Sequence, residues 1–164
     1  MFVLTFKSNK GRLLIALIVV ALLISLLMAL IFSGIGQGTF AVSSNFRYST
    51  AAETNEDRVA FLKQFDWDVS EDPVEVRQVL IPEDFSGPFE NYNNMQKMQG
   101  LDLLPYAGVS VKCYTYEIYN FPTDTGDKIL ANLLVYQGKV IGGDVCSAKL
   151  DGFMQGFAPL ENRG

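Results

Sequence analysis

The feature that most constrains this chain is a run of twenty uncharged residues close to its beginning. Leu13 to Phe32 reads LLIALIVVALLISLLMALIF and contains one hydroxyl group, that of Ser25. A helix of this length spans about 30 Å, which is the thickness of the hydrocarbon core of a bilayer. A buried helix of a globular domain rarely lacks a polar face over so many turns. The run therefore predicts a membrane-inserted helix over residues 13–32.

The charges around this run predict its orientation. Lys7, Lys10 and Arg12 precede it, and no acidic residue does. Because positively charged flanks stay in the cytoplasm, we expect the chain after Phe32 to lie outside the cell membrane. The competing interpretation is a cleaved signal peptide, which has a shorter apolar region of about 7–15 residues before its cleavage site. The best site here, the AVS that begins at Ala41, is weak, so we expect a single-pass anchor and leave cleavage open.

The chain beyond the run is strongly acidic. Three of the 13 basic residues lie within the first twelve positions, which leaves ten basic against 18 acidic side chains and a net charge of −8 for the rest. Phosphate binding needs a basic surface, so this charge argues against nucleic acid as a partner. It also disfavours docking on an anionic lipid surface.

The patterns along the chain predict five segments. Residues 33–52 are rich in Gly, Ser and Thr and lack a periodic apolar pattern, which is typical of a flexible linker. Their three large apolar side chains leave open that part of this linker packs on the domain. We expect a cytoplasmic N-terminus over 1–12, the transmembrane helix, the linker, an outer domain over 53–157 and a tail over 158–164.

Two helices are predicted in the outer domain. Thr54 and Asp57 have the spacing of a capping box, and the helix that they begin should end near Phe65. A second helix is expected over 88–99, because Pro88 suits a first helical turn and Gly100 suits a C-terminal end. Its inner face is expected to carry Phe89, Tyr92 and Met95, and Met98 is a further candidate.

Runs of β-branched and aromatic residues predict four strands, over 74–81, 109–121, 129–136 and 139–147. The last three are joined by two turns, PTDTGD and Gln137-Gly138, and are expected to form an antiparallel meander. The order of helix, strand, helix and meander predicts an α+β fold with the helices on one face of the sheet.

The turns also predict a register. Counting from them pairs Val135 with Val140 and Leu133 with Gly142. One face then carries five core residues and is assigned to the helices, which Gly142 would allow to approach closely: Tyr116, Ile118, Leu133, Val135 and Val140.

The same register predicts that the two cysteines are free. It places Cys113 opposite Tyr136, beside Lys139, and Cys146 lies seven residues further along that strand. This corresponds to about 23 Å, whereas a disulfide needs Cα atoms within about 7 Å. We therefore expect no disulfide between Cys113 and Cys146, and a core position in which Cys146 acts as a small apolar residue.

The absence of histidine from the sequence excludes Ser-His-Asp and Cys-His catalysis and imidazole-containing zinc sites. Two cysteines cannot form a four-thiolate metal site. Asp66, Asp68, Glu71 and Asp72 crowd together but lack the glycine of a calcium loop, so they are interpreted as a solvated loop. We expect no catalytic residues, no metal site and no cofactor.

Five blocks of the outer domain resemble an uncharacterised domain family of Gram-positive, largely clostridial, bacteria: ETNEDRVAFLKQFDWDV, MQKMQGLDLLPYAG, KCYTYEIYNFP, ANLLVYQGKVIGGDVCS and LDGFMQGF. The resemblance covers Glu53 to Phe157. It implies a bacterial membrane protein with an outer domain of unknown function, and it implies no activity. The candidate interaction or family-motif positions are Tyr114, Tyr116, Gly142, Gly143, Asp144, Cys146, Asp151, Gly152 and Phe153.

We therefore expect a membrane-anchored domain that binds a protein, a peptide or an envelope component without catalysis. An exposed edge strand would offer a route, since it can accept the backbone of another chain. One alternative is a histidine-free hydrolase or thiol enzyme that uses Cys146 or paired acids. Another is a structural spacer subunit of a membrane complex. The sequence defines neither the ligand nor the oligomeric state.

Overall fold

The structure is a computed structural model that describes residues 40–43, 46–122 and 126–158. The predicted transmembrane helix over 13–32 and the N-terminus before it lie outside these residues. Within the part of the chain that is described, no helix combines the length and the apolar character that crossing a membrane requires.

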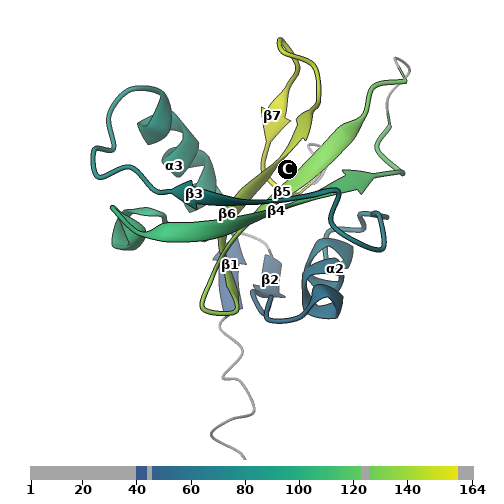
Figure 1. Ribbon diagram of the computed structural model, residues 1–164, viewed down its shortest axis with the longest axis horizontal. Coiled ribbons are helices and arrows are strands. Elements are labelled where there is room, and N and C mark those ends of the chain that lie inside the picture. The colour runs from purple at the N-terminus through teal and green to yellow at the C-terminus, as the bar shows by residue number, and fades with distance from the viewer. Residues whose placement is uncertain (1–39, 44–45, 123–125, 159–164) are drawn as a thin grey trace, which may run out of the picture. The chain divides into compact units, whose positions relative to one another are not determined.

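The described chain has an α+β fold built on a five-stranded antiparallel sheet with the strand order β3–β4–β5–β6–β7 (Figure 1). The strands of this sheet are β3 (Glu75–Leu80), β4 (Ser110–Ile118), β5 (Ile129–Tyr136), β6 (Lys139–Ser147) and β7 (Met154–Gln155). A separate two-stranded sheet is formed by β1 (Phe40–Ser43) and β2 (Phe46–Ser49). The helices are α2 (Asn55–Lys63), α3 (Pro88–Met98) and the short 3₁₀ helix η1 (Leu104–Tyr106).

The predicted α+β class and the meander β4–β5–β6 are confirmed, but the sheet is larger than the meander. β3 pairs with β4 at one edge, and β7 pairs with β6 at the other. The sequence predicts the strand over 74–81 without a partner, because periodicity along a strand does not define which strand lies beside it. β7 has two residues, too few for a periodic signal.

Both helices begin where the sequence predicts. The Thr54 hydroxyl accepts a hydrogen bond from the Asp57 N–H (3.2 Å), and the Asp57 carboxylate accepts one from the Thr54 N–H (3.0 Å). These reciprocal bonds are the expected capping box at the start of α2. At the start of α3, Gly87 precedes the helix with φ of 60°, and Pro88 occupies the first turn.

The buried face of α3 differs from the prediction. Its buried residues are Asn93 and Gln96, while Phe89 and Tyr92 are half-buried and Met98 is 63% exposed. The apolar pattern therefore gave only part of the contact face. Each amide oxygen has a backbone partner in this buried position: Asn93 Oδ1 accepts from the Leu103 N–H (2.8 Å) and Gln96 Oε1 accepts from the Gly143 N–H (2.9 Å).

The two helices lie on opposite faces of the sheet, so the expectation that both cover one face is wrong (Figure 1). α2 packs on a cluster that includes Phe61, Leu62, Tyr116, Leu133 and Val145. α3 packs beside a second cluster, which comprises Ile81, Leu103, Val111, Cys113, Leu134 and Ile141. We call these sides the α2 face and the α3 face.

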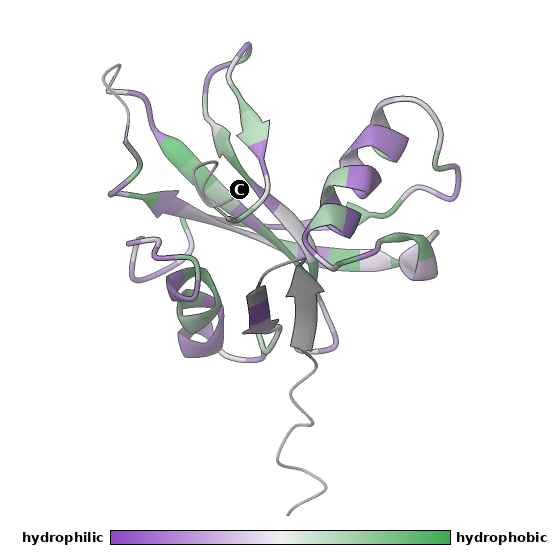
Figure 2. Ribbon diagram, turned by 180° about the vertical axis from the view of Figure 1, so that it is seen from behind, coloured by the Kyte–Doolittle hydropathy of each residue, from purple (hydrophilic) through white to green (hydrophobic). Residues whose placement is uncertain are grey.

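The pattern of burial along β6 shows that both faces of the sheet are covered. Every residue from Val140 to Val145 is buried, which an exposed sheet face would not allow. Seen from behind and coloured by hydropathy, α2 and α3 both carry hydrophilic stretches, as expected for helices with one side in water (Figure 2).

The register of β5 and β6 contains a bulge. Val135 pairs with Val140 as predicted, but Leu134, not Leu133, pairs with Gly142, because Ile141 is inserted between the two pairs. The five predicted core residues do belong to the cluster on the α2 face. Gly142 lies on the α3 face instead, since a one-residue shift moves a side chain to the other side of a sheet.

The last part of the predicted linker belongs to the domain. Tyr48 is 1% exposed, and its hydroxyl donates to the carbonyl of Gln99. The side chain of Gln64 bonds the backbone of Ser49 in both directions, at 2.7 and 3.0 Å. The boundary at residue 53 is therefore too late, because β2 already contributes to the core.

The C-terminal segment is held by the one tryptophan of the sequence. The indole N–H of Trp67 donates to the carbonyl of Phe157 (2.7 Å). The indole also stacks on Phe121, which stacks in turn on Phe153. Phe157 is fully buried, so the residues after β7 close the α2 face.

Candidate functional site

The two edges of the sheet differ in how far their backbone groups are covered. At the β6 edge, β7 pairs with Val145 and Cys146 and goes no further. Beyond it, Gly143 donates its N–H to Oε1 of Gln96 (2.9 Å), and its carbonyl accepts from Nε2 of Gln99 (3.3 Å). Two glutamine side chains of the α3 region therefore take the place of a missing strand.

Gly143 makes this arrangement possible. Its φ is 153°, and a Cβ atom at this position would lie 2.1 Å from the carbonyl oxygen of Asn132 and 2.5 Å from Cζ of Phe157. No other residue fits this space. A Cβ at Gly142 would meet Leu103 Cδ2 at 2.8 Å, so Gly142 does permit a close approach, but on the α3 face.

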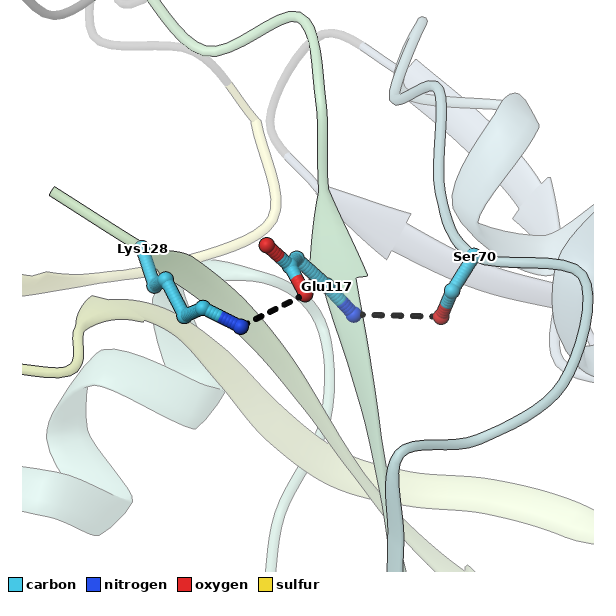
Figure 3. Close-up of polar contacts among 3 residues, drawn as sticks. All are labelled: Ser70, Glu117 and Lys128. Atoms are coloured by element: carbon cyan, nitrogen blue, oxygen red, sulfur yellow. Dashed lines mark hydrogen bonds and ion pairs between the residues drawn. The ribbon is translucent and has the colours of Figure 1, made fainter. Parts of the chain in front are cut away.

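The edge of β4 is also covered where β3 does not reach. The Ser70 N–H donates to the carbonyl of Glu117 (2.9 Å), and the Glu117 N–H donates to the Ser70 hydroxyl (3.2 Å) (Figure 3). The Glu117 carboxylate forms an ion pair with Lys128, which directly precedes β5 (3.2 Å). The segment before β3 thus completes the pairing of β4.

The outer side of β3 is open. Ile81, next to the strand end, donates to the Val109 carbonyl and accepts from the Gly108 N–H, so its backbone groups point towards β4. Because backbone direction alternates along a strand, Val76 and Gln78 direct their N–H and C=O groups outward. Among the described residues, no strand pairs with this side of β3.

The side chains of β3 are as exposed as its backbone. Val74, Val76 and Leu80 are 54%, 52% and 64% exposed. Val76 pairs with Tyr114, which packs against the α2-face cluster, so Val76 and Leu80 lie on the α2 side. An exposed apolar edge is what soluble sheets usually avoid, because it can pair with another strand.

A shallow groove of about 360 Å³ runs beside this edge. It is lined by apolar, aromatic and polar side chains together, among them Gln78, Lys112, Tyr114, Val135 and Tyr136. The Arg58 guanidinium lies 3.9 Å from the centre of the Tyr114 ring and holds that ring in place.

A network of polar side chains crosses the α3 face. The carboxylate of Asp144 accepts hydrogen bonds from the Tyr92 hydroxyl (2.9 Å) and from Nδ2 of Asn132 (2.9 Å). Asn132 also accepts from the Thr115 hydroxyl (2.8 Å), and its Nδ2 lies 3.4 Å from Sγ of Cys146. The network joins β4, β5, β6 and α3.

The titratable groups of this network are poorly suited to catalysis. Burial raises the pKa of Asp144, although the hydrogen bonds from Asn132 and Tyr92 act in the opposite direction. Burial and the neighbouring Asp144 carboxylate raise the pKa of Cys146 to about 11. Since the thiolate is the nucleophile, a thiol that stays protonated near neutral pH is a poor catalyst. The network is better suited to fixing the register of the sheet than to covalent chemistry.

The acidic cluster also lacks the features of an active site. Asp66, Asp68, Glu71 and Asp72 are all exposed, as expected for a solvated loop. Within the described ranges, no group of three or more carboxylates or thiolates is placed to hold a metal ion.

The structure brings some of the predicted positions together and separates others. Asp144 and Cys146 share the polar network, whereas Tyr114 and Tyr116 lie on the opposite face. Tyr116 is buried and receives a hydrogen bond from Arg58, so its role is in packing. Asp151, Gly152 and Phe153 belong to the connection between β6 and β7, outside the network.

Cys113 and Cys146 are both free in the structure. Cys113 pairs with Leu134, two positions from the predicted partner Tyr136, and remains on the same face. Cys146 lies four residues beyond Gly142, the partner of Leu134, so the cysteines are separated along the strands. Cys146 lies on the α3 face beside Asp144, and not in the α2-face core that the predicted register assigns to it.

Sequence reasoning missed Tyr92 and Asn132 as partners of Asp144, and Thr115 as a partner of Asn132. The available signal was the presence of polar residues in the middle of strands that otherwise carry apolar side chains. It also missed the open edge of β3 as a specific surface, because exposure depends on the strand order.

Comparisons with known proteins bear on the family alone. No curated protein and no solved structure matches the chain. One family model matches residues 61–145, from the second half of α2 to the end of the buried part of β6. This range holds Gly142, Gly143 and Asp144, and covers just over half of the chain. The chain therefore belongs to the family described as Domain of unknown function (DUF4830).

Proposed function

We propose that this protein is a single-pass membrane protein whose outer domain binds an extended segment of a protein partner along β3. The uncharged run over 13–32, with three basic residues before it, supports the anchor and the outward orientation of the domain. The resemblance to domains of Gram-positive bacteria supports a location on the outer surface of such a cell.

The open edge of β3 is the observation that carries the binding role. The opposite edge is closed by β7 and by Gln96 and Gln99, so the fold has the means to cover an edge. At β3 the outward backbone groups coincide with the apolar side chains of Val76 and Leu80, which are both more than half exposed. Main-chain hydrogen bonds would supply affinity, and the groove beside Tyr114 would supply selectivity.

The high pKa of Cys146 disfavours the alternative of a thiol enzyme. The solvent exposure of the acidic cluster disfavours a hydrolase with paired carboxylates, which needs a protected site. A structural spacer needs no open edge, so it leaves the exposure of β3 unexplained.

The anchor is tested with the full-length chain in membranes. Carbonate washing should leave the chain in the membrane, and external protease should release the region after Phe32. A soluble protein that begins near Ser43 or Ser44 would contradict the anchor and favour a cleaved signal.

The binding edge is tested by photo-crosslinking in the same membranes. A photoreactive residue at Val76 should give a discrete protein adduct, and the same residue at the exposed Ala60 of α2 should not. Val76→Pro removes an outward N–H and should abolish the adduct formed from a photoreactive residue at Leu80. Equal labelling from Val76 and Ala60 would contradict the proposal.

A further inference from the structure

We propose that the segment bound by β3 is β3 of a second copy of this chain, so that two sheets join across a two-fold axis. This inference rests on the proposed function and names the partner at the same edge. The charge pattern of β3 carries it.

The outward backbone groups decide which residues can form the hydrogen-bonded pairs. Val76 and Gln78 point outward, so an antiparallel copy of β3 must pair even-numbered residues with even-numbered residues. Odd-numbered residues then face odd-numbered residues. Glu75 and Arg77 of one copy therefore lie on the same face, the α3 face, as Glu75 and Arg77 of the second copy.

One register makes these charges complementary. When the two-fold axis passes through Val76, Glu75 of each chain faces Arg77 of the other, and the two Val76 side chains meet on the α2 face. Two ion pairs and an apolar contact form at once, because an isologous interface repeats each contact. Cross-strand pairs of opposite charge and of β-branched residues both stabilise a sheet.

The neighbouring registers lack this match. An axis through Arg77 places the two Arg77 side chains opposite each other, and an axis through Glu75 does the same with two carboxylates. Like charges directly opposite each other are destabilising. An axis through Gln78 places Arg77 opposite Val79 and forms no ion pair. The register centred on Val76 is thus selected by charge.

The solvent exposure of these residues permits the contact. Glu75 and Arg77 are exposed, as are Val74, Val76 and Gln78. The strand is flanked by Pro73 and Pro82, which cannot donate a main-chain hydrogen bond and so confine the pairing to the segment between them. The interface is therefore short and centred on Val76.

Cysteine crosslinking tests the register in the full-length chain in its membrane. At the two-fold axis the Val76 Cα atoms lie about 5.5 Å apart, within the range of a disulfide. Val76→Cys should give a disulfide-linked dimer under mild oxidation. Leu80→Cys is equally exposed and on the same face, but the two copies of residue 80 would be eight positions, or about 26 Å, apart. We expect at least tenfold less dimer from Leu80→Cys and none from the unaltered chain.

Charge exchange tests the ion pairs. Arg77→Glu and Glu75→Arg should each reduce the yield of dimer from Val76→Cys at least tenfold, because each places like charges opposite each other. A mixture of the two variants should form the mixed dimer, and the double variant that exchanges both charges should recover the original yield. The melting temperatures of all variants are compared, so that a folding defect is recognised.

The outcomes separate the two proposals. Equal crosslinking of Val76→Cys and Leu80→Cys, or no dimer from either, overturns the inference, as does a yield unaffected by the charge variants. If photoreactive Val76 then labels a different protein, the inference fails and the proposed function stands. If it labels nothing, both fail.

Discussion

Both edges of the sheet carry backbone N–H and C=O groups that have no neighbouring strand, but only the β6 edge has these groups covered. At the β6 edge, the N–H and C=O of Gly143 are both bonded by glutamine side chains, β7 pairs with the end of the strand, and residues 50–52 pair with its beginning. At the β3 edge, the corresponding groups of Val76 point outward, and no strand of the described residues pairs with them. The closed edge depends on residues that tolerate little change, whereas the open edge tolerates change in the monomer. Residues that cannot be substituted at the β6 edge are therefore needed for folding, whereas residues that cannot be substituted at the β3 edge would be needed for binding.

The largest effect is expected where the closed edge is tightest. Gly143→Ala would place a Cβ 2.1 Å from a backbone oxygen, so we expect a loss of about 3 kcal/mol or more in the free energy of unfolding. Urea denaturation measures it. Gly142→Ala is the control, since its Cβ meets the flexible end of Leu103 and should cost about 1 kcal/mol. Similar losses for the two variants would contradict the described geometry.

Removing a glutamine should also open the closed edge. Gln99→Ala deletes a hydrogen bond from the Phe157 N–H (2.6 Å) and one to the Gly143 carbonyl (3.3 Å), both in buried surroundings. We expect about 1–3 kcal/mol of destabilisation, because the backbone partners are left without bonds. Hydrogen exchange should show faster exchange at Phe157. Ordinary protection of Phe157 in a folded variant would mean that the glutamine is not the strand substitute described here.

The buried Asp144 should make the stability depend on pH. Its pKa is raised in the folded state, so the folded protein holds the proton more tightly, and stability is lost as pH rises from the ordinary aspartate value through the raised pKa. A tenfold difference in proton affinity between the folded and unfolded states corresponds to about 1.4 kcal/mol. Asp144→Asn should remove this loss, so the stability of the variant relative to the unaltered chain should increase over the pH range above the ordinary aspartate pKa. A constant difference across that range would contradict the raised pKa of Asp144.

The smallest effect on stability is expected at the open edge. Val76→Lys replaces a side chain that is 52% exposed at the edge of the sheet, so the free energy of unfolding should change by less than about 0.5 kcal/mol. The same variant should lose the photo-crosslinked adduct formed at Leu80. A large loss of stability would show that β3 is covered, and the contrast between the edges would disappear.

The elements of this fold could be predicted more readily than their arrangement. The strands over 129–136 and 139–147 and the capping box of α2 follow from local patterns of residues. The opposite placement of α2 and α3 follows from the bulge at Ile141 and from the burial of both faces of β6, neither of which a strict alternation reveals. The open edge could not be predicted because it requires the position of β3 in the strand order.

Part of the candidate chemistry could be predicted as well. The absence of histidine already removed the commonest catalytic arrangements. The partners of Asp144 come from α3 and from β5, and contacts between distant segments are set by tertiary packing. Residues 33–52 are predicted to form a linker because that range as a whole is rich in Gly, Ser and Thr, and this composition hides the anchoring role of Tyr48.

The position of Trp67 gives the domain its own optical reporter. Its indole is buried, 4% exposed, and its N–H is bonded to Phe157 in the C-terminal segment. Fluorescence excited at the indole therefore comes from one site, and its emission should be shifted to the blue in the folded state. Release of the C-terminal segment would redden the emission without unfolding the sheet. Detachment of the segment and global unfolding would thus be distinguishable by comparing fluorescence with far-ultraviolet circular dichroism in one titration.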